Sequence, residues 1–223
     1  MKIVNDNRFG AFTILLRLTA CWILLLAFIV LSFGSRSSSI PVHPGGKAAR
    51  SISQPEKVRK IYTSQIGIRE EGHNSGNAVE AYLTYVGLPK GNPWCAAFVC
   101  WVFGQAGVEN PRTGWSPALF RSSRVIWERE KSRNSAVSAK ASAQEGPARP
   151  QTGDVFGIYF PEKARIAHVG FIDQWDGTWL ITVEGNTNYS GSREGDGVYR
   201  KRRLLSSIYK VARYISLSGK EGS

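Results

Sequence analysis

The chain has few of the residues that cross-link small proteins or bind metal ions. Its 223 residues include only three cysteines and three histidines, and no Cys-x-x-Cys pattern occurs. Three cysteines provide no disulfide framework. Cys95 and Cys100 are five residues apart, so on one helix they would point about 140° away from each other. The histidines are too scattered for a structural metal site. We therefore expect no metal and no cofactor.

Acidic residues are also scarce. The chain has 17 Asp and Glu against 29 Lys and Arg, which gives a net charge of +12. This excess suggests an anionic partner or surface. The densest cluster is residues 200–203 (Arg-Lys-Arg-Arg). Its simplest interpretation is a solvated strand end, and the alternative is contact with an anionic polymer or lipid head groups. No nucleic-acid-binding motif accompanies the charge, so we expect no nucleic-acid partner.

One long hydrophobic run lies near the N-terminus. Residues 18–35 carry no charge. Three basic residues precede them: Lys2, Arg8 and Arg17. A run of this length falls between a short membrane-spanning helix and the core of a long signal peptide. We interpret residues 1–34 as a signal anchor, held in the membrane through residues 11–33, or as a signal peptide cleaved near residues 32–34.

The rest of the chain divides by composition. Residues 35–53 are rich in serine and contain proline and paired glycine, which is typical of a flexible linker. Residues 54–216 form the expected folded domain. Within it, residues 128–150 have no aromatic side chain and are mostly Lys, Arg, Ser, Ala and Glu, so we expect a mobile insertion there. Residues 217–223 are assigned as a tail.

Three helices are predicted in the first half of the folded domain. The first covers about residues 54–64, and the second repeats apolar residues at helical spacing over residues 79–86. The third has Asn92 as its N-cap and Pro93 in its first helical position. Every side chain in residues 94–103 is apolar or cysteine, so this helix is expected to be buried on nearly all sides.

Strands dominate the second half. We expect them at residues 154–160, 168–172, 179–186, 198–203 and 208–215, bounded by turn residues. The second and third form a hairpin. Helices followed by antiparallel strands predict an α+β domain in which the N-terminal helices pack on an antiparallel sheet.

Cys95 is the first candidate for chemistry. A thiol is nucleophilic as a thiolate, and the first turn of a helix lowers its pKa through the helix dipole. A nearby imidazole would lower the pKa further by forming a thiolate–imidazolium pair. The same helix start offers unused backbone N–H groups that would serve as an oxyanion hole. Cys100, deeper in the helix, is expected to be an ordinary small buried side chain.

The predicted hairpin places three more candidates together. If residues 175–177 form a three-residue loop, counting back along both strands sets His168 directly opposite Glu184. Directly opposite residues share a face of the sheet, and Asn186 would lie diagonally within reach on that face. A loop of two residues would break the arrangement. The candidate site is therefore Cys95, His168 and either Glu184 or Asn186.

Four short motifs in this order resemble the CHAP family of cysteine- and histidine-dependent amidohydrolases and peptidases, over about residues 55–215. They are Trp94-Cys95-Ala96-Ala97-Phe98, Gly153-Asp154-Val155, His168-Val169-Gly170-Phe171 and Glu184-Gly185-Asn186. Residues 68–72 and Asn74 are similar to the start of such bacterial domains. The resemblance implies a papain-like fold, with Cys95 as the nucleophile, His168 as the base and Glu184 or Asn186 as the orienting group.

The resemblance also implies a substrate and a location. Peptidoglycan would be cleaved at the amide between glycan and stem peptide or within the peptides. We expect the domain on the periplasmic or extracellular side of the cell envelope, tethered to the inner membrane, or secreted if the N-terminal segment is cleaved. Two alternatives remain, a non-catalytic wall-binding or scaffold module on the same fold and an antibacterial wall-degrading effector. Neither the bond that is cut nor the oligomeric state follows from the sequence.

Overall fold

A computed structural model describes residues 52–129, 149–190 and 195–216. The predicted N-terminal hydrophobic segment, nearly all of the linker, most of the insertion and the tail lie outside these ranges. No helix within the described ranges is long and apolar enough to cross a membrane.

The described residues contain three α-helices: α2 (Gln54–Ser64), α3 (Asn77–Tyr85) and α4 (Cys95–Ala106). Helix α2 begins with a capping box, in which the Ser53 hydroxyl accepts a hydrogen bond from the Glu56 N–H and the Glu56 carboxylate accepts one from the Ser53 N–H. Helix α4 ends at Gly107, whose left-handed backbone (φ 73°) favours glycine. All three helices lie where the sequence predicts them, within a few residues.

The start of α4 is a correction to the prediction. Asn92 is not the N-cap and Pro93 is not in the helix, because α4 begins at Cys95 with Trp94 in the cap position. No side chain of the cap residue satisfies the helix start. Instead, the Trp94 N–H donates to Oδ1 of Asn186 over 3.0 Å. A side chain far away in the sequence thus holds this turn, which local sequence signals cannot reveal.

The strands in the described ranges form one antiparallel sheet in the order β1-β6-β2-β3-β4-β5. Their bounds are β1 Val125–Glu128, β2 Val155–Phe160, β3 Arg165–Trp175, β4 Trp179–Thr187, β5 Gly197–Leu204 and β6 Lys210–Ala212. Three 3-10 turns complete the described elements: η1 (Ser116–Leu119) lies between α4 and β1, η2 (Pro161–Lys163) connects β2 to β3, and η3 (Leu205–Ser207) connects β5 to β6. The predicted combination of helices with an antiparallel sheet is confirmed. Strand β1 was not predicted, and its last residue, Glu128, is not part of an insertion.

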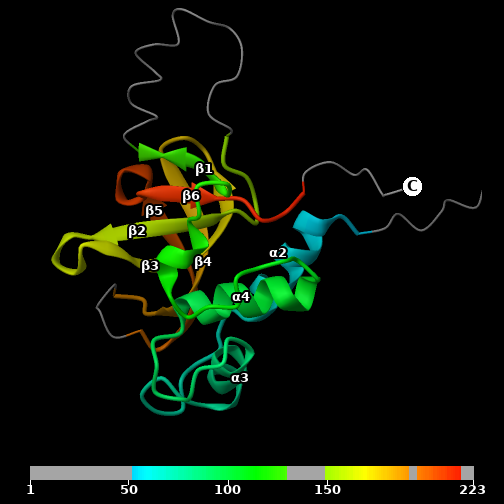
Figure 1. Cartoon of the computed structure of the whole chain (residues 1–223), viewed down its shortest axis with the longest axis vertical. Coiled ribbons are helices and arrows are strands. Elements are labelled where there is room, and N and C mark those ends of the chain that lie inside the picture. The colour runs from blue at the N-terminus through cyan, green and yellow to red at the C-terminus, as the bar shows by residue number, and fades with distance from the viewer. Residues whose placement is uncertain (1–51, 130–148, 191–194, 217–223) are drawn as a thin grey trace, which may run out of the picture. The chain divides into compact units, whose positions relative to one another are not determined.

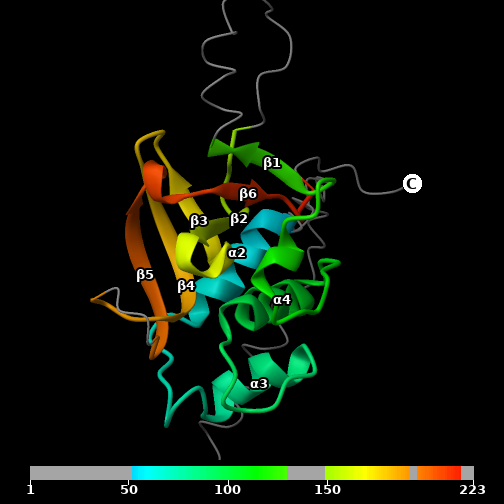
Figure 2. The same cartoon turned by 60° about the vertical axis from the view of Figure 1, so that its left-hand side comes forward.

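Helices α2 and α4 pack against one face of the sheet, and α4 lies between α3 and the sheet (Figures 1 and 2). Phe171 of β3 is at the centre of this core. Its ring stacks on Tyr62 of α2 with 4.9 Å between centroids, and it meets Phe98 and Phe103 of α4 edge-on. All four rings are fully buried. Each such side chain contributes roughly 1.5–3 kcal/mol by burial, so these contacts fix α4 on the sheet.

A smaller apolar cluster occupies the opposite face of the sheet. Successive residues of a strand point to opposite faces, so Phe171 joins the helix-side core while its neighbour Ile172 joins the second cluster. The fully or mostly buried members of the second cluster are Trp127, Phe156, Ile172, Leu180, Ile208 and Val211. The second face of the sheet therefore carries a buried apolar cluster of its own.

The hairpin between β3 and β4 has a different register from the predicted one. Trp175 pairs with Leu180, which leaves an even number of residues, 176–179, between the last paired positions of the two strands rather than three. The Asp176 carboxylate stabilises this loop by accepting hydrogen bonds from the N–H groups of Thr178 and Trp179. An even-length loop would by itself put His168 and Glu184 on opposite faces of the sheet.

A bulge in β3 restores the parity. Asp173 is an extra residue between the pairs Gln174–Ile181 and Ile172–Thr182. Its carboxylate is fully buried and accepts hydrogen bonds from Arg59 and Tyr62 of α2 and from Arg200 of β5. The predicted shared face is therefore kept, but by an even loop plus one bulged residue. The predicted direct pairing is wrong: because Phe171 pairs with Val183, Glu184 comes opposite Gly170 and lies diagonal to His168.

Gly185 lies where β4 approaches the start of α4. A Cβ atom at this position would lie 2.6 Å from the Trp94 ring and 2.8 Å from the Phe98 ring. We predict that Gly185→Ala lowers the free energy of unfolding by about 1–3 kcal/mol, because neither buried ring has room to move. Urea denaturation measures this, with Gln174→Ala, an exposed substitution on β3, as a control expected to change stability by less than about 0.5 kcal/mol. Equal stability of the two variants would contradict the tight approach.

Candidate active site

Cys95 is the first residue of α4, and only 6% of its surface is exposed. Its Sγ lies 3.6 Å from Oγ of Ser116, the first residue of η1. Ser116 was not among the residues predicted for the site. It follows Cys95 by 21 residues, and no motif marks it as a partner of the thiol.

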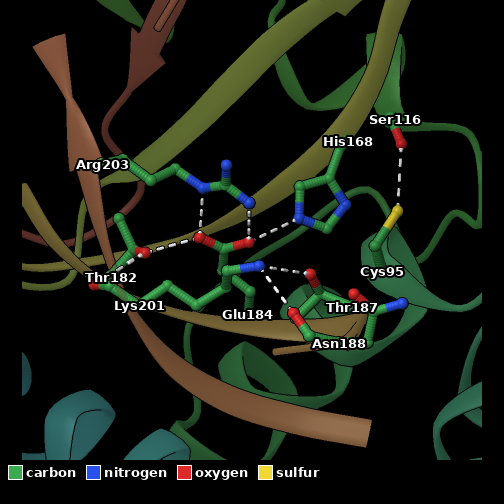
Figure 3. Close-up of polar contacts among 9 residues, drawn as sticks. All are labelled: Cys95, Ser116, His168, Thr182, Glu184, Thr187, Asn188, Lys201 and Arg203. Carbon is green, nitrogen blue, oxygen red and sulfur yellow. Dashed lines mark hydrogen bonds and ion pairs between the residues drawn. The ribbon is translucent and has the colours of Figure 1, made fainter. Parts of the chain in front are cut away.

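His168 lies on β3, on the side of the sheet opposite the Phe171 core. Its Nε2 is 2.8 Å from Oε2 of Glu184 on β4. The other ring nitrogen, Nδ1, points toward the sulfur of Cys95 (Figure 3). The imidazole thus lies between the thiol and the carboxylate. The thiol comes from the start of a helix, and the other two groups come from adjacent strands.

The Glu184 carboxylate is fully buried and has a complete set of partners. Both guanidinium nitrogens Nε and Nη2 of Arg203 on β5 donate to it, one to each oxygen. The hydroxyl of Thr182 donates to Oε1, while His168 contacts Oε2. A bidentate arginine is the strongest common partner of a carboxylate, and here it offsets the cost of burying the charge.

These contacts set the charges of the imidazole and the carboxylate. Burial alone would raise the pKa of Glu184, but the hydrogen bonds and charges of Arg203 and His168 hold it well below its usual range. Burial alone would lower the pKa of His168, but hydrogen bonds and charge from Cys95 and Glu184 raise it to about 9. The imidazole is therefore positively charged at neutral pH.

The charged imidazole acts in turn on Cys95. Burial raises the pKa of this thiol, but the hydrogen bond and positive charge of His168 outweigh burial, helped by Ser116 and the backbone of Val169, and the net shift is downward. Cys100 has no such partner, and burial raises its pKa to about 11. The two thiols, both free and buried, thus differ in reactivity because of their surroundings.

Asn186 does not orient His168 in this structure. Its backbone is left-handed (φ 53°), and its Oδ1 accepts the hydrogen bond from the Trp94 N–H described above. Its Nδ2 donates to Oδ1 of Asn74 over 3.1 Å. Asn186 therefore holds the turn immediately before Cys95, and of the two candidates for the third member it is Glu184 that forms a hydrogen bond with the His168 ring. Which of the two orients the imidazole in catalysis stays a prediction.

Glu70 also stabilises the turn that precedes Cys95. Its Oε1 accepts a 2.7 Å hydrogen bond from the Trp94 indole, and its Oε2 accepts one from the Asn74 N–H. Asn74 in turn exchanges backbone and side-chain hydrogen bonds with Gly91. The loops on both sides of α3 are thereby tied to the residue that precedes the thiol, which limits movement of Cys95.

The basic cluster at residues 200–203 is not simply a solvated strand end. Arg200 and Arg203 pair with the buried carboxylates Asp173 and Glu184. The Lys201 ammonium donates to the Asn188 carbonyl over 2.6 Å (Figure 3). The pattern of residues along β5 could not predict these ion pairs, because the buried carboxylates lie on β3 and β4.

Two clefts in the described residues meet at the thiol. The first, which we call the arginine cleft, has a volume of about 480 Å³ and is lined in part by Arg112, Trp115 and Arg165. The second, the histidine cleft, has a volume of about 510 Å³ and is lined in part by His73 and His168. Four residues line both clefts: Pro93, Cys95, Lys163 and Ala167. An extended substrate would therefore have space on both sides of Cys95.

Comparison with known families agrees with the geometry. Residues 87–186 match the family model of the CHAP domain. Residues 87–186 are therefore similar to the CHAP domain family. The predicted resemblance is confirmed, and the matched segment includes the thiol, the imidazole and the carboxylate, whereas Arg203 lies outside it. Searches of the curated proteins and of the solved structures found no match. In the part of the chain that the structure describes, no three side chains are grouped as metal ligands.

We predict that Cys95 is alkylated by iodoacetamide much faster than Cys100 at neutral pH, because only its pKa is lowered. Peptide mass spectrometry over a pH series gives the rate at each thiol. In His168→Ala the pH at which Cys95 becomes reactive should rise, since burial would then dominate its pKa. Equal reactivity of the two thiols, or no change in His168→Ala, would contradict the thiolate–imidazolium pair.

Proposed function

We propose that this protein cleaves an amide or peptide bond of peptidoglycan through a cysteine thioester. The CHAP domain indicates a hydrolase of the peptidoglycan amidase or peptidase type. In our proposal Cys95 is the nucleophile, His168 moves the proton and Glu184 orients the imidazole. The observation that carries the proposal is the buried Glu184–Arg203 pair, which keeps a positive imidazole beside the thiol.

A papain-like arrangement is part of the same proposal. Papain-like hydrolases place a nucleophilic cysteine at the start of a helix that packs on an antiparallel sheet carrying the histidine. Helix α4, with Cys95 in its first position, and β3, with His168, have this relationship here. The support is the order and packing of these elements.

In the acylation step the Cys95 thiolate attacks the amide carbon, and a carbon–sulfur bond forms. His168 gives its proton to the leaving nitrogen as the carbon–nitrogen bond breaks, so an amine leaves and a thioester remains. The negative oxygen that develops on the substrate carbon lies near the start of α4. The Cys95 N–H, which has no acceptor within its own helix, would donate to that oxygen.

In the deacylation step water resolves the thioester. The now neutral His168 takes a proton from water as its oxygen attacks the thioester carbon, and the carbon–sulfur bond breaks. The products are a carboxylic acid, which then loses its proton to the solvent at neutral pH, and the restored thiolate–imidazolium pair. Glu184 keeps the ring in one orientation through both steps, because its own oxygens are fixed by Arg203 and Thr182.

We further propose that the domain works outside the cytoplasm, because its substrate is there, and that residues 1–34 export or tether it. A reporter that is active only after export, fused at residue 50, should give signal. Strong signal from a reporter that is active only in the cytoplasm would contradict this location.

We predict that Cys95→Ala abolishes release of muropeptides from purified peptidoglycan, because no other described group near His168 can form the thioester. Cys100→Ala is the matched control: this buried side chain should cost roughly 1–2 kcal/mol of stability while activity per folded molecule is retained. Mass spectrometry of the products also identifies the bond that is cut.

The results of this assay distinguish a hydrolase from a non-catalytic scaffold. Loss of activity in Cys100→Ala alone would overturn the assignment of the nucleophile. Binding of peptidoglycan without any release of fragments by the wild-type protein would instead favour a wall-binding module on the same fold.

A further inference from the structure

The arginine cleft contains positive charge that the proposed mechanism does not use. Arg112, Lys163 and Arg165 all line it, and none of the described residues of its lining is a carboxylate. It opens directly beside Cys95, so whatever binds there lies next to the bond under attack.

The two guanidinium groups are held in place without being neutralised. Arg165 lies 4.2 Å above the Trp115 ring and donates to the Ile166 carbonyl. Arg112 lies 4.5 Å above the Tyr85 ring and donates to the Tyr85 carbonyl through Nε and Nη2. Among the described residues, neither arginine forms an ion pair with a carboxylate. Aromatic and carbonyl contacts thus fix the groups while leaving their charges uncompensated.

Lys163 adds a third positive charge at the junction of the two clefts. It follows Pro161 in the turn η2, is exposed, and lies 5.7 Å from the Phe160 ring. The described lining of the histidine cleft offers less to an anion, because Arg203 and the His168 imidazole are both paired with Glu184 and Lys163 is shared with the arginine cleft. The available positive charge is therefore concentrated on the arginine side of Cys95.

We propose that the arginine cleft binds a free carboxylate of the peptide substrate, close to the scissile amide, and so selects acidic stem peptides over amidated ones. This inference rests on the proposed function for the identity of the substrate. Fixed cations that border a cleft favour a carboxylate over the neutral carboxamide of the same shape, because only the carboxylate forms charge-assisted hydrogen bonds. The apolar wall made by Val86 and Leu88 suits a short aliphatic part of the same peptide.

The test compares one ligand pair on the full-length protein. The pair is a soluble stem peptide with free carboxylates and the same peptide with its carboxylates converted to carboxamides. We expect wild-type KM to be at least about tenfold lower for the acidic peptide, the ratio typical of one hydrogen bond to a charged group, with similar kcat. Arg165→Gln and Lys163→Gln should each remove most of this ratio.

Arg202→Gln is the matched control. Arg202 is also an exposed arginine stacked on a tryptophan, Trp179, but it lies outside both clefts, so the ratio should be unchanged. Equal wild-type KM values for the two peptides would overturn the inference. A loss in Arg165→Gln that is the same for both peptides would also overturn it and would assign the cleft to a neutral part of the substrate.

Binding to the Cys95→Ala protein separates this inference from the proposed function. Calorimetry with the same two peptides should show the same preference for the acidic one without any turnover. If wild-type protein cleaves neither peptide but Cys95→Ala binds the acidic one at least about tenfold more tightly, the proposed function fails and the carboxylate site stands. If both are cleaved and bound equally, the hydrolase stands and the carboxylate site fails.

Discussion

The candidate site depends on one buried carboxylate. A carboxylate with no exposed surface would normally take up a proton, but Glu184 accepts hydrogen bonds from Arg203 and Thr182 and contacts His168, so it remains charged. That charge keeps the imidazole positive, and the positive imidazole outweighs the burial of the Cys95 thiol. The lowered pKa of the Cys95 thiol therefore depends on contacts that begin at Arg203 on β5 and pass through Glu184 and His168, rather than on the helix start alone.

The positions of Glu184, His168 and Cys95 depend on two local features of the sheet, a bulge in β3 and a glycine in β4. The bulged Asp173, held by α2, returns β3 and β4 to the register in which the imidazole and the carboxylate share a face. Gly185 lets β4 approach the helix that carries the thiol, and Asn186 next to it bonds the backbone of Trp94. Residues 184–186 of β4 thus have two roles. Glu184 contacts the imidazole, and Asn186 holds the turn that precedes Cys95.

Much of the fold and of the candidate site could be predicted from the sequence. The remaining features depend on contacts between distant residues, which the sequence does not show. Helical spacing and apolar alternation predicted the helices and most strands, and face parity put His168 and Glu184 side by side. The parity was right although the loop length was wrong, because an even loop and a bulge cancel. The contacts of Asn186 with Trp94 and of Ser116 with Cys95 could not be predicted, because each joins residues that are far apart in the sequence. The N-terminal segment lies outside the described residues and stays a prediction.

The most direct measurement is the pKa of the His168 imidazole in the resting protein, obtained by NMR titration of isotope-labelled histidine. We expect a value of about 9, well above the ordinary 6.5. In Glu184→Gln the value should fall, because removal of the negative charge destabilises the imidazolium. A wild-type value at or below 6.5, or one unchanged in Glu184→Gln, would contradict the claim that the buried carboxylate holds the imidazole in its charged form.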